Sequence, residues 1–478
     1  MVFYGSMGLG HAKNVFLTST IFLILISVIV PQVIFGESFR ERGEREERNE
    51  RIIAGQYIVV LKDSVADADT AEADIVSRVL GTRLASYRSA LNGFAARFSE
   101  TDLEAVMNDP RVAFVSEDRE VSIVDVKSTS DVRSVWRDRR GFPPPPPSPS
   151  PSPSPSPAPP PEAEAKPSAG GITSLQQLST GVDRINAESK MNKGSGVHVA
   201  VIDTGIQLSH PDLKANIVGG KNCSTGTSYN DGNGHGTHVA GTIAALDNGL
   251  GVVGVAPSSR LWAVRVLNNS GGGSWSTVIC GLDFVTSMAP KNGGPITVAN
   301  LSLGGGGVSD NNCGNSNNDA LHKAICRARD AGVTVVVAAG NNGVNAAGFV
   351  PAAYDDAVIT VSALADSNGK SGGGGPSTSY GADDTFASFS NWGTPVDIGA
   401  PGVSIYSTWL NSTYKSISGT SMASPHAAGA AALYIATHPG ALWGEVRSAL
   451  VAAGEALGAG HTDPGGKHPE KVLRADTL

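Results

Sequence analysis

The stretch Val197–Gly205 (VHVAVIDTG) decides the fold, because a short apolar run ends directly in Asp203, Thr204 and Gly205. Similar apolar runs follow along the chain at Leu261–Val266 (LWAVRV), Val298–Leu303 (VANLSL), Val333–Ala338 (VTVVVA) and Val358–Ser362 (VITVS). Stretches with helical spacing separate them, at Thr237–Ala245, Ser276–Met288, Asp319–Ala331 and Ala423–Thr437. This alternation predicts an α/β domain over residues 174–478, with a mostly parallel sheet covered by helices on both faces.

Three motifs in this domain carry reactive side chains, and Asp203 belongs to the first. A carboxylate at the C-terminal end of a parallel strand lies in the crevice where such sheets bind ligands. The Asp-Thr-Gly triplet also marks aspartic proteases, but those need two carboxylates that share a proton. The sequence has no second D-T-G or D-S-G, so we set that class aside.

The second motif is His235–Thr242 (HGTHVAGT). We expect a tight turn at Gly236, followed by a helix whose small residues allow it to pack closely on the sheet. His235 and His238 could suggest a metal pair. No third ligand motif such as H-E-x-x-H accompanies them, so we expect His238 to be structural.

The third motif is Ser418–His426 (SGTSMASPH), just before a long Ala-rich stretch. It predicts Ser421 at a helix N-terminus, where the helix dipole and free N–H groups favour an oxyanion. A serine in this position is by itself usually an N-cap. Together with an aspartate and a histidine, however, it supplies the nucleophile of a triad whose base and buried carboxylate are also present.

The three motifs, in the order Asp, His, Ser, resemble the subtilisin-like serine proteases of the subtilisin and proteinase K branch, from about residue 176 almost to the C-terminus. The resemblance implies an endopeptidase with Asp203, His235 and Ser421 as its triad, and Asn341 as the side-chain donor of the oxyanion hole. It implies two backbone edges that pair with an extended protein or peptide substrate. These edges are Ser302, Leu303 and Gly304 on one side and Gly271, Gly272 and Gly273 on the other. Phe349 is expected near the S1 wall, favouring apolar or aromatic P1 residues, with a plain core aromatic as the alternative.

The resemblance also implies a structural Ca²⁺ ion, because His235–Pro257 matches the family segment without gaps. The expected oxygen ligands are Gln176, Asp212, Leu246, Asn248, Leu250 and Val252. Calcium takes six to eight such oxygens. The alternative is a Gly/Asn turn beside a solvated aspartate. A second, weaker site is expected at Asp397, with the carbonyls of Asp356 and Val358.

Residues 56–124 predict a smaller α+β domain. Its expected strands are Gln56–Leu61, Gly93–Phe98 and Ala113–Val115, and its helices Thr70–Leu80 and Thr101–Asn108. Ser99 and Asp102 give the second helix a capping signal. The domain resembles the ferredoxin-like, I9-type inhibitory propeptide of the same family. That resemblance implies a chain that blocks its own active site and cuts itself near residues 121–128.

The remaining segments concern export. Lys13 precedes an apolar run, Val15–Val30, which predicts a signal peptide over residues 1–36, with an uncleaved anchor as the alternative. Residues 37–55 are expected to form a charged linker, and residues 125–173 a second linker. The second contains a Ser-Pro-rich spacer, Pro143–Pro161, which resembles wall-protein segments of plants and green algae. We therefore expect a secreted protein, with the cell wall as an alternative location.

The net charge limits the binding partners that we expect, and the cysteine content limits the disulfide pairings. The net charge of −8 gives no reason to expect nucleic acid, and we expect a monomer whose mature form is not embedded in a membrane. Four cysteines allow three pairings, of which we favour Cys313–Cys326 with Cys223–Cys280. Sequons at Asn222, Asn268 and Asn411 indicate a glycoprotein, whereas the sequon at Asn300 lies on an expected buried strand.

Two other functions compete with the protease. One is a wall or matrix protein that uses an inactive protease scaffold, with its Pro-rich arm as the working part. The intact set of Asp203, His235, Ser421 and Asn341 argues against it. The other is a G-x-S-x-G esterase, but Ala423 breaks that motif and the order of the three motifs differs.

Overall fold

The computed structural model describes residues 51–123 and 175–478. The expected signal peptide, the Pro-rich spacer and the part of the maturation window beyond residue 123 lie outside the described residues. Within the described residues, no helix is long and apolar enough to cross a membrane.

The larger domain is built on a nine-stranded sheet in the order β18-β15-β13-β11-β9-β5-β7-β6, with β14 paired to β13. All pairs along this order are parallel, and only the β13–β14 pair is antiparallel. The strands are β5 (His198–Asp203), β6 (Ile217–Asn222), β7 (Arg260–Arg265), β9 (Ile296–Leu301), β11 (Thr334–Ala338), β13 (Ile359–Ala365), β14 (Thr385–Phe386), β15 (Ile398–Pro401) and β18 (Lys471–Val472). The expected mostly parallel sheet is therefore confirmed.

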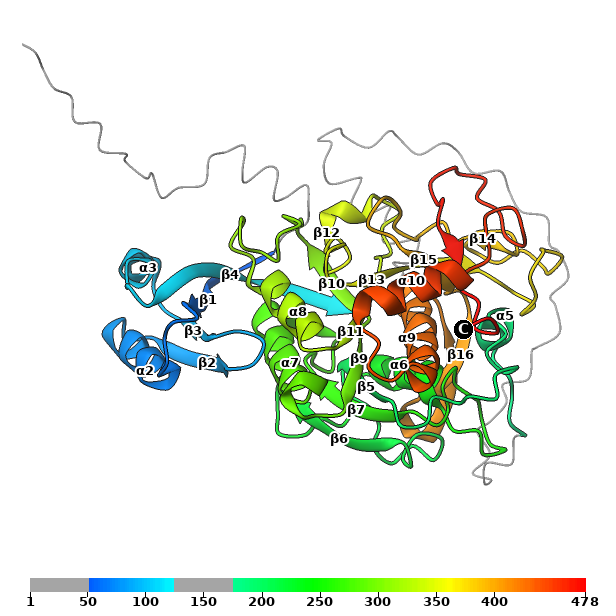
Figure 1. The fold of residues 1–478 in the computed structure, drawn as a ribbon, viewed down its shortest axis with the longest axis horizontal. Helices are drawn as coiled ribbons and strands as arrows, with labels where there is room; N and C mark the ends of the chain where they lie inside the picture. The colour runs from blue at the N-terminus through cyan, green and yellow to red at the C-terminus, as the bar shows by residue number, and fades with distance from the viewer. Residues whose placement is uncertain (1–50, 124–174) are drawn as a thin grey trace, which may run out of the picture. The chain divides into compact units, whose positions relative to one another are not determined.

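Helices cover both faces of this sheet (Figure 1). They are α5 (Thr180–Arg184), α6 (His235–Ala244), α7 (Trp275–Ser287), α8 (Ala320–Asp330), α9 (Thr420–Thr437) and α10 (Trp443–Ala453). On β5, Val199 and Val201 join the apolar cluster of α6 and α9, whereas Ala200 and Ile202 join that of α7 and α8. Burial on both faces explains why the strands are continuous apolar runs rather than alternating ones.

Strand β5 lies at the point where the strand order reverses, between β7 and β9. Parallel sheets form a crevice at such a point, outside the carboxyl ends of the strands. Asp203 is the last residue of β5 and Ser302 follows β9. The topology therefore brings both residues to the same edge of the sheet.

The smaller domain contains β1 (Ile52–Leu61), α2 (Ala68–Arg78), β2 (Thr82–Tyr87), β3 (Gly93–Arg97), α3 (Glu100–Met107) and β4 (Val112–Ile123). Strand β1 pairs antiparallel with both β3 and β4. It begins at Ile52, so the last residues of the expected charged linker belong to a strand. Ser99 stands before α3 but does not cap it, because its hydroxyl bonds the Asp102 carboxylate instead.

Strand β4 runs past its own domain into the larger one. It has 12 residues, where the sequence predicted a strand only over Ala113–Val115. Its last residues pair antiparallel with β8 (Gly272–Ser274) on one side and with β10 (Leu303–Gly306) on the other. Strand β10 in turn pairs with β12 (Phe349–Val350). The seven-stranded sheet of order β12-β10-β4-β1-β3-β2, with β8 beside β4, thus joins the two domains.

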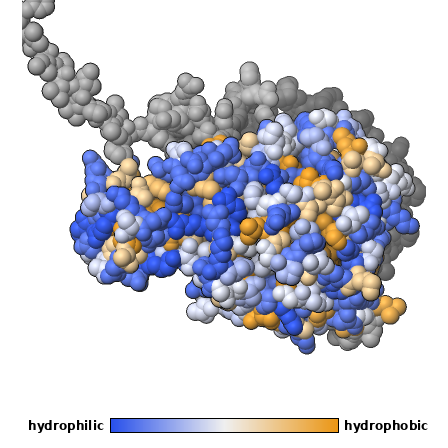
Figure 2. Space-filling view, viewed as in Figure 1, coloured by the Kyte–Doolittle hydropathy of each residue, from blue (hydrophilic) through white to orange (hydrophobic). Residues whose placement is uncertain are grey.

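The remaining elements lie at the periphery. A hairpin of β16 (Ile405–Trp409) and β17 (Thr413–Ile417) packs on α6, and short 3₁₀ turns occur at Pro290–Asn292, Ala346–Gly348 and Leu410–Ser412. Both favoured disulfides, Cys223–Cys280 and Cys313–Cys326, are present. On the face drawn in Figure 2, apolar residues form small separate groups among hydrophilic ones.

Candidate active site

Asp203 and His235 form a buried hydrogen-bonded pair at the carboxyl edge of the sheet. His235 Nδ1 lies 2.8 Å from Asp203 Oδ1 and 3.0 Å from Oδ2. The Asp203 side chain is completely buried, and its Oδ1 also accepts a hydrogen bond from the Thr204 amide. A carboxylate held against Nδ1 fixes the imidazole tautomer and orientation, which a general base requires.

Two glycines and one carboxylate place His235 at the start of α6. Gly234, with φ of 109°, makes the turn into the helix, so the tight turn expected at Gly236 occurs two residues earlier. Gly236 instead allows close packing, because a Cβ there would lie 2.2 Å from the Gly205 carbonyl oxygen. The Asp231 carboxylate accepts bonds from three backbone amides around the turn and from the Thr237 hydroxyl. Sequence analysis missed Asp231, which stands four residues before the histidine in a loop without a distinctive pattern.

Ser421 lies in the first turn of α9 and is completely buried. Its hydroxyl donates to the Ser302 carbonyl at 3.2 Å, and the Ser302 hydroxyl donates to the Ser421 carbonyl at 2.9 Å. Helix α9 packs against α6, whose first residue is His235. The nucleophile candidate therefore lies at a helix N-terminus, beside the β9–β10 edge.

Asn341 is tied to the same helix terminus. Its side-chain oxygen accepts bonds from the Thr420 amide and the Thr420 hydroxyl, each at 2.8 Å. The Thr420 hydroxyl in turn accepts a bond from the Gly340 amide. These bonds orient the side-chain amide, whose nitrogen is the donor toward an oxyanion. Sequence analysis also missed this role of Thr420, although Thr420 lies in the Ser418–His426 motif.

His238 and His426 are buried histidines with structural roles. His238 Nε2 lies 2.9 Å from the Ile405 carbonyl, and His426 Nδ1 lies 2.8 Å from the Met422 carbonyl. Burial lowers the pKa of His238 to about 3 and that of His426 to about 4. Both rings are therefore neutral at physiological pH, and His238 serves as a bridge between α6 and the β16–β17 hairpin.

The two predicted substrate edges face each other across β4. Leu303 pairs with Ile123 and Gly304 with Ser122, while Gly273 pairs with Val121 and Gly272 with Ser122. The amide of Ile123 donates to the Gly271 carbonyl at 2.9 Å. A segment of the chain itself therefore occupies the position in which an extended substrate would pair.

A cavity of about 580 Å³ opens beside this strand, and its lining includes Asn341, Gly304, Phe349 and Ile123. Phe349 is half-buried and packs directly on Gly304, where a Cβ would lie 2.4 Å from its ring. Phe349 therefore lines the groove in addition to belonging to β12.

The six residues predicted as calcium ligands come together at the far end of α6. The Gln176 side-chain nitrogen meets the carbonyl oxygens of Leu246 and Val252, at 2.8 and 3.3 Å. The Asn248 side-chain nitrogen lies 3.1 Å from Asp212 Oδ1, and the Leu250 amide donates to Asn248 Oδ1. Asp212 is completely buried, and burial raises its pKa to about 6. Both amide oxygens accept backbone N–H bonds in this structure. The set nevertheless supplies carboxylate, amide and carbonyl oxygens, so its chemistry fits a hard cation.

The second expected calcium site is not supported. Asp397 forms an ion pair with Arg447, and the Asp356 carbonyl accepts a bond from Arg329. Guanidinium groups thus take the positions where the sequence led us to expect a metal ion. The sequence pattern could not show this, because Arg447 lies 50 residues from Asp397.

The parallel sheet carries a buried Asp–His pair at its carboxyl edge and a serine at a helix N-terminus. This combination defines the protein as a serine-type hydrolase with an α/β architecture. Comparison with known proteins makes this more specific. The subtilase family model (peptidase S8) matches residues 194–467, and the peptidase inhibitor I9 model matches residues 56–124. The chain belongs to the subtilase family.

Two curated relatives and one solved structure illustrate the likeness. The chain is 45% identical over 281 residues to Subtilisin DY of Bacillus licheniformis, covering 58% of this chain and 89% of that protein. It is 44% identical over 288 residues to Subtilisin Savinase of Lederbergia lenta, covering 59% and 94%. The crystal structure of a cold adapted subtilisin-like serine proteinase matches with a TM-score of 0.50 and 34% identity, covering 63% of this chain and 98% of that one. The protein is therefore a serine-type endopeptidase, made with an I9 domain that acts as an intramolecular inhibitor.

Proposed function

We propose that the protein hydrolyses peptide bonds through an acyl-enzyme formed on Ser421. His235 removes the hydroxyl proton and later gives it to the leaving amine, while Asp203 holds the imidazole and stabilises its charged form. The Asn341 side chain and the Ser421 amide donate to the developing oxyanion. The observation that carries this proposal is the buried Asp203–His235 pair, 2.8 Å apart, at the crevice that also receives the N-terminus of α9.

The substrate is an extended polypeptide that replaces β4 between β8 and β10. Backbone pairing with Gly271–Gly273 and Ser302–Gly304 does not select side chains, so specificity should be broad. Selectivity would come from the P1 side chain. Phe349 supports a preference for apolar or aromatic P1 residues, because it lines the cavity beside Asn341 and Gly304.

The pairing of β4 also suggests where the precursor is cut. Ile123 pairs with Leu303, and the Ile123 amide bonds the Gly271 carbonyl. Counted in this register, the next residue along the chain, Val124, would be the P1 residue. We therefore place the self-cleavage between Val124 and Asp125, within the expected window of residues 121–128. After the cut, the domain ending at Val124 remains as a competitive inhibitor until it is degraded.

We further propose that Ca²⁺ holds the loop Leu246–Val252. The ion would be bound by the Asp212 carboxylate, the side-chain oxygens of Gln176 and Asn248, and the carbonyls of Leu246, Leu250 and Val252. Its role would be to fasten the start of the peptidase domain to this loop, which is otherwise linked to it by the Leu175–Leu250 and Gln177–Val252 bridges. Export from the cell would supply calcium and permit the two disulfides.

A serine-reactive fluorophosphonate probe tests the mechanism. The wild-type protein should appear as a cleaved, labelled chain. Ser421→Ala should remain an unlabelled, uncut precursor and lose about 10⁶-fold in kcat. Ser418→Ala, in the same motif, is the matched control and should mature and be labelled.

A trace of active enzyme added to the Ser421→Ala precursor should cut it, and mass spectrometry should then find Val124 at the new C-terminus. Normal maturation of pure Ser421→Ala protein would show that the chain does not process itself. An unlabelled wild-type protein would favour the inactive scaffold.

A further inference from the structure

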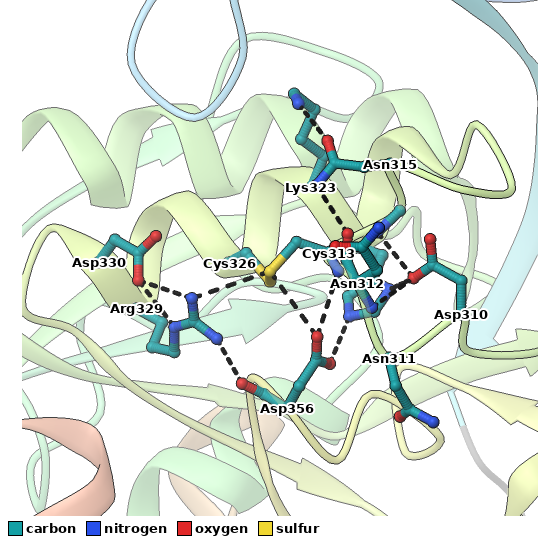
Figure 3. Close-up of a disulfide and its surroundings, with 12 residues drawn as sticks. Asp310, Asn311, Asn312, Cys313, Asn315, Lys323, Cys326, Arg329, Asp330 and Asp356 are labelled. Atoms are coloured by element: carbon teal, nitrogen blue, oxygen red, sulfur yellow. Dashed lines mark hydrogen bonds and ion pairs between the residues drawn. A yellow bond between two sulfur atoms is a disulfide. The ribbon is translucent and has the colours of Figure 1, made fainter.

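Helix α8 carries a group of metal-ligand side chains away from the catalytic crevice. His322 and Cys326 are four residues apart and lie on one face of α8. Cys313 comes from the loop before α8, and Asp356 from the turn before β13 (Figure 3). One ligand atom from each of these four residues lies within 4.8 Å of the other three. Among residues 51–123 and 175–478, this is the only such group of three or more His, Cys, Asp and Glu residues.

The imidazole of His322 is held as metal-binding histidines are. Its Nε2 lies 2.6 Å from Asp356 Oδ1, and its Nδ1 lies 3.2 Å from Asp310 Oδ1 on the opposite side. The ring is completely buried and stacks on Tyr354 at 4.0 Å between centroids. The Nδ1–Asp310 contact has an ion-pair distance without hydrogen-bond geometry, whereas Nε2 is hydrogen-bonded to Asp356. A carboxylate on the far side of the ring is the usual outer partner of a zinc-bound histidine.

Asp310 is itself fixed by the backbone. Its carboxylate accepts bonds from the amides of Asn312, Gly314 and Ser316. It therefore serves as an outer partner rather than as a ligand. Asp356 is the reachable carboxylate, with about a quarter of its side chain exposed (24%), and it gives the group an access route from solvent.

The Cys313 sulfur lies beside one cationic and one anionic group. Arg329 Nη2 lies 3.8 Å from Cys313 Sγ and favours its thiolate, whereas Asp356 Oδ2, 3.7 Å from the same sulfur, opposes the thiolate unless a cation binds between them. A guanidinium beside a sulfur stabilises its thiolate form once the disulfide is open. Four ligands of a tetrahedral zinc ion lie about 3.3 to 3.8 Å apart. Shifts of about 1 Å from the present positions would reach this spacing.

We propose that this pocket binds one Zn²⁺ ion when the Cys313–Cys326 disulfide is reduced. The ligands are both sulfurs, His322 Nε2 and one oxygen of Asp356. A dithiol supplies two electrons and two protons, opens the bond to two thiols and itself becomes a disulfide. Zinc then replaces the two thiol protons, which leave to water, and the remaining imidazole proton resides on Nδ1 facing Asp310. In either state the loop after β10 stays fastened to α8, by a covalent bond or by a metal ion.

The chain contains its own control. Cys223 and Cys280 form the other disulfide, and within the described residues no group of candidate ligands surrounds it. The two test proteins both carry Ser421→Ala to prevent self-digestion. One retains only the Cys313 pair (C223S/C280S), and the other only the Cys223 pair (C313S/C326S).

Each protein is reduced with dithiothreitol, freed of reductant without oxygen, and titrated with Zn²⁺ against a chromophoric chelator. We expect one zinc ion for the chain with the Cys313 pair and none for the other or for either oxidised chain. Co²⁺ should give a thiolate-to-metal charge-transfer band with the Cys313 pair alone. His322→Gln should weaken binding at least 100-fold, and Asp310→Asn 10- to 100-fold. Asp63→Asn, an exposed carboxylate that pairs with Arg327 of the same helix, should have no effect.

Two results would overturn the proposal. One is a reduced chain that keeps its near-ultraviolet circular dichroism but takes up no zinc. The other is zinc uptake that His322→Gln leaves unchanged. If reduction unfolds the chain, stoichiometric zinc should restore the dichroism, because metal binding then supplies folding free energy. Failure to restore it also contradicts the site.

Discussion

The two ends of helix α6 hold their polar groups in different ways. At the first end, His235 is buried with Asp203, and Asp231 binds the amides of the preceding turn. At the other end the chain enters a loop whose residues Asn248, Gly249 and Leu250 are exposed. There the Gln176 and Asn248 amides occupy places that a cation could take. The reactive end is thus organised by buried hydrogen bonds within the protein, whereas the opposite end has a ligand set that suits an ion.

This difference separates rate from stability. A change in the crevice should alter kcat strongly and unfolding only modestly, because the core around it persists. A change in the loop should do the opposite. The middle of the helix provides a third case, because His238 is buried there between α6 and the β16–β17 hairpin.

The largest expected effect concerns the crevice. Asn341→Ala should lower kcat by about 10²- to 10³-fold with little change in KM, because the amide acts on the oxyanion rather than on the bound substrate. The melting temperature of the mature enzyme should fall modestly, because the Thr420 amide and hydroxyl lose their acceptor. Val344→Ala, at an exposed residue outside the cavity lining, is the control and should retain full activity. A change confined to KM would assign Asn341 to substrate binding instead.

The crevice was also the part that sequence predicted best. Its residues lie in short motifs next to strongly patterned elements, so β5, α6 and α9 were placed to within three residues. The apolar run at Val298–Leu303 was only partly right. Strand β9 ends at Leu301, and β10 starts at Leu303 and pairs in a different sheet.

The rest could not be predicted because long-range pairing decides it. In β4, the stretch Ser116–Glu120 (SEDRE) is rich in charge and has low strand propensity. It is nevertheless extended, because β1 pairs with it and Asp118 bonds the Ser276 amide and hydroxyl of the peptidase domain. Strand β6 was missed for a similar reason, since Gly219 and Gly220 weaken its pattern. Nor does any local signal reveal that Arg447 pairs with Asp397.

The next largest expected effect concerns the loop Leu246–Val252 and is measured as a change in melting temperature. Removing calcium with EDTA should lower the melting temperature of the Ser421→Ala precursor, since the ion binds only the folded chain. Calcium at 100 times its Kd contributes about 2.7 kcal/mol. Asp212→Ala should melt at the EDTA-treated temperature and should no longer respond to EDTA. Asp247→Asn, at an exposed position of the same loop, should keep the response. If wild type and Asp212→Ala melt together with and without calcium, the loop holds no ion.

The smallest expected effect concerns His238, in the middle of α6. It appears only as a pH dependence of the unfolding free energy. Burial lowers the pKa of His238 to about 3, against about 6.5 for the imidazole in an unfolded chain. Above pH 6.5 both states are neutral and the histidine adds no pH dependence. As the pH falls below 6.5, the unfolded chain takes up a proton that the folded chain refuses. The unfolding free energy should then decrease by about 1.4 kcal/mol per pH unit on this account.

Some other buried groups change the unfolding free energy with pH in the opposite direction. A variant is therefore needed to isolate the contribution of His238. Burial raises the pKa of Asp366 to about 7 and that of Asp397 to about 6. These carboxyls keep protons in the folded state that the unfolded chain releases, and they stabilise the fold as pH falls. The measured quantity is therefore the difference in urea unfolding between the Ser421→Ala precursor and the same chain with His238→Gln. That difference should shrink by about 1.4 kcal/mol per pH unit between pH 6 and pH 4.5, because glutamine does not titrate.

His438→Gln, at an exposed histidine, should give a constant difference. A constant difference for His238→Gln as well would mean that the folded chain accepts the proton. Helix α6 would then be open to water at His238, one turn from the catalytic His235.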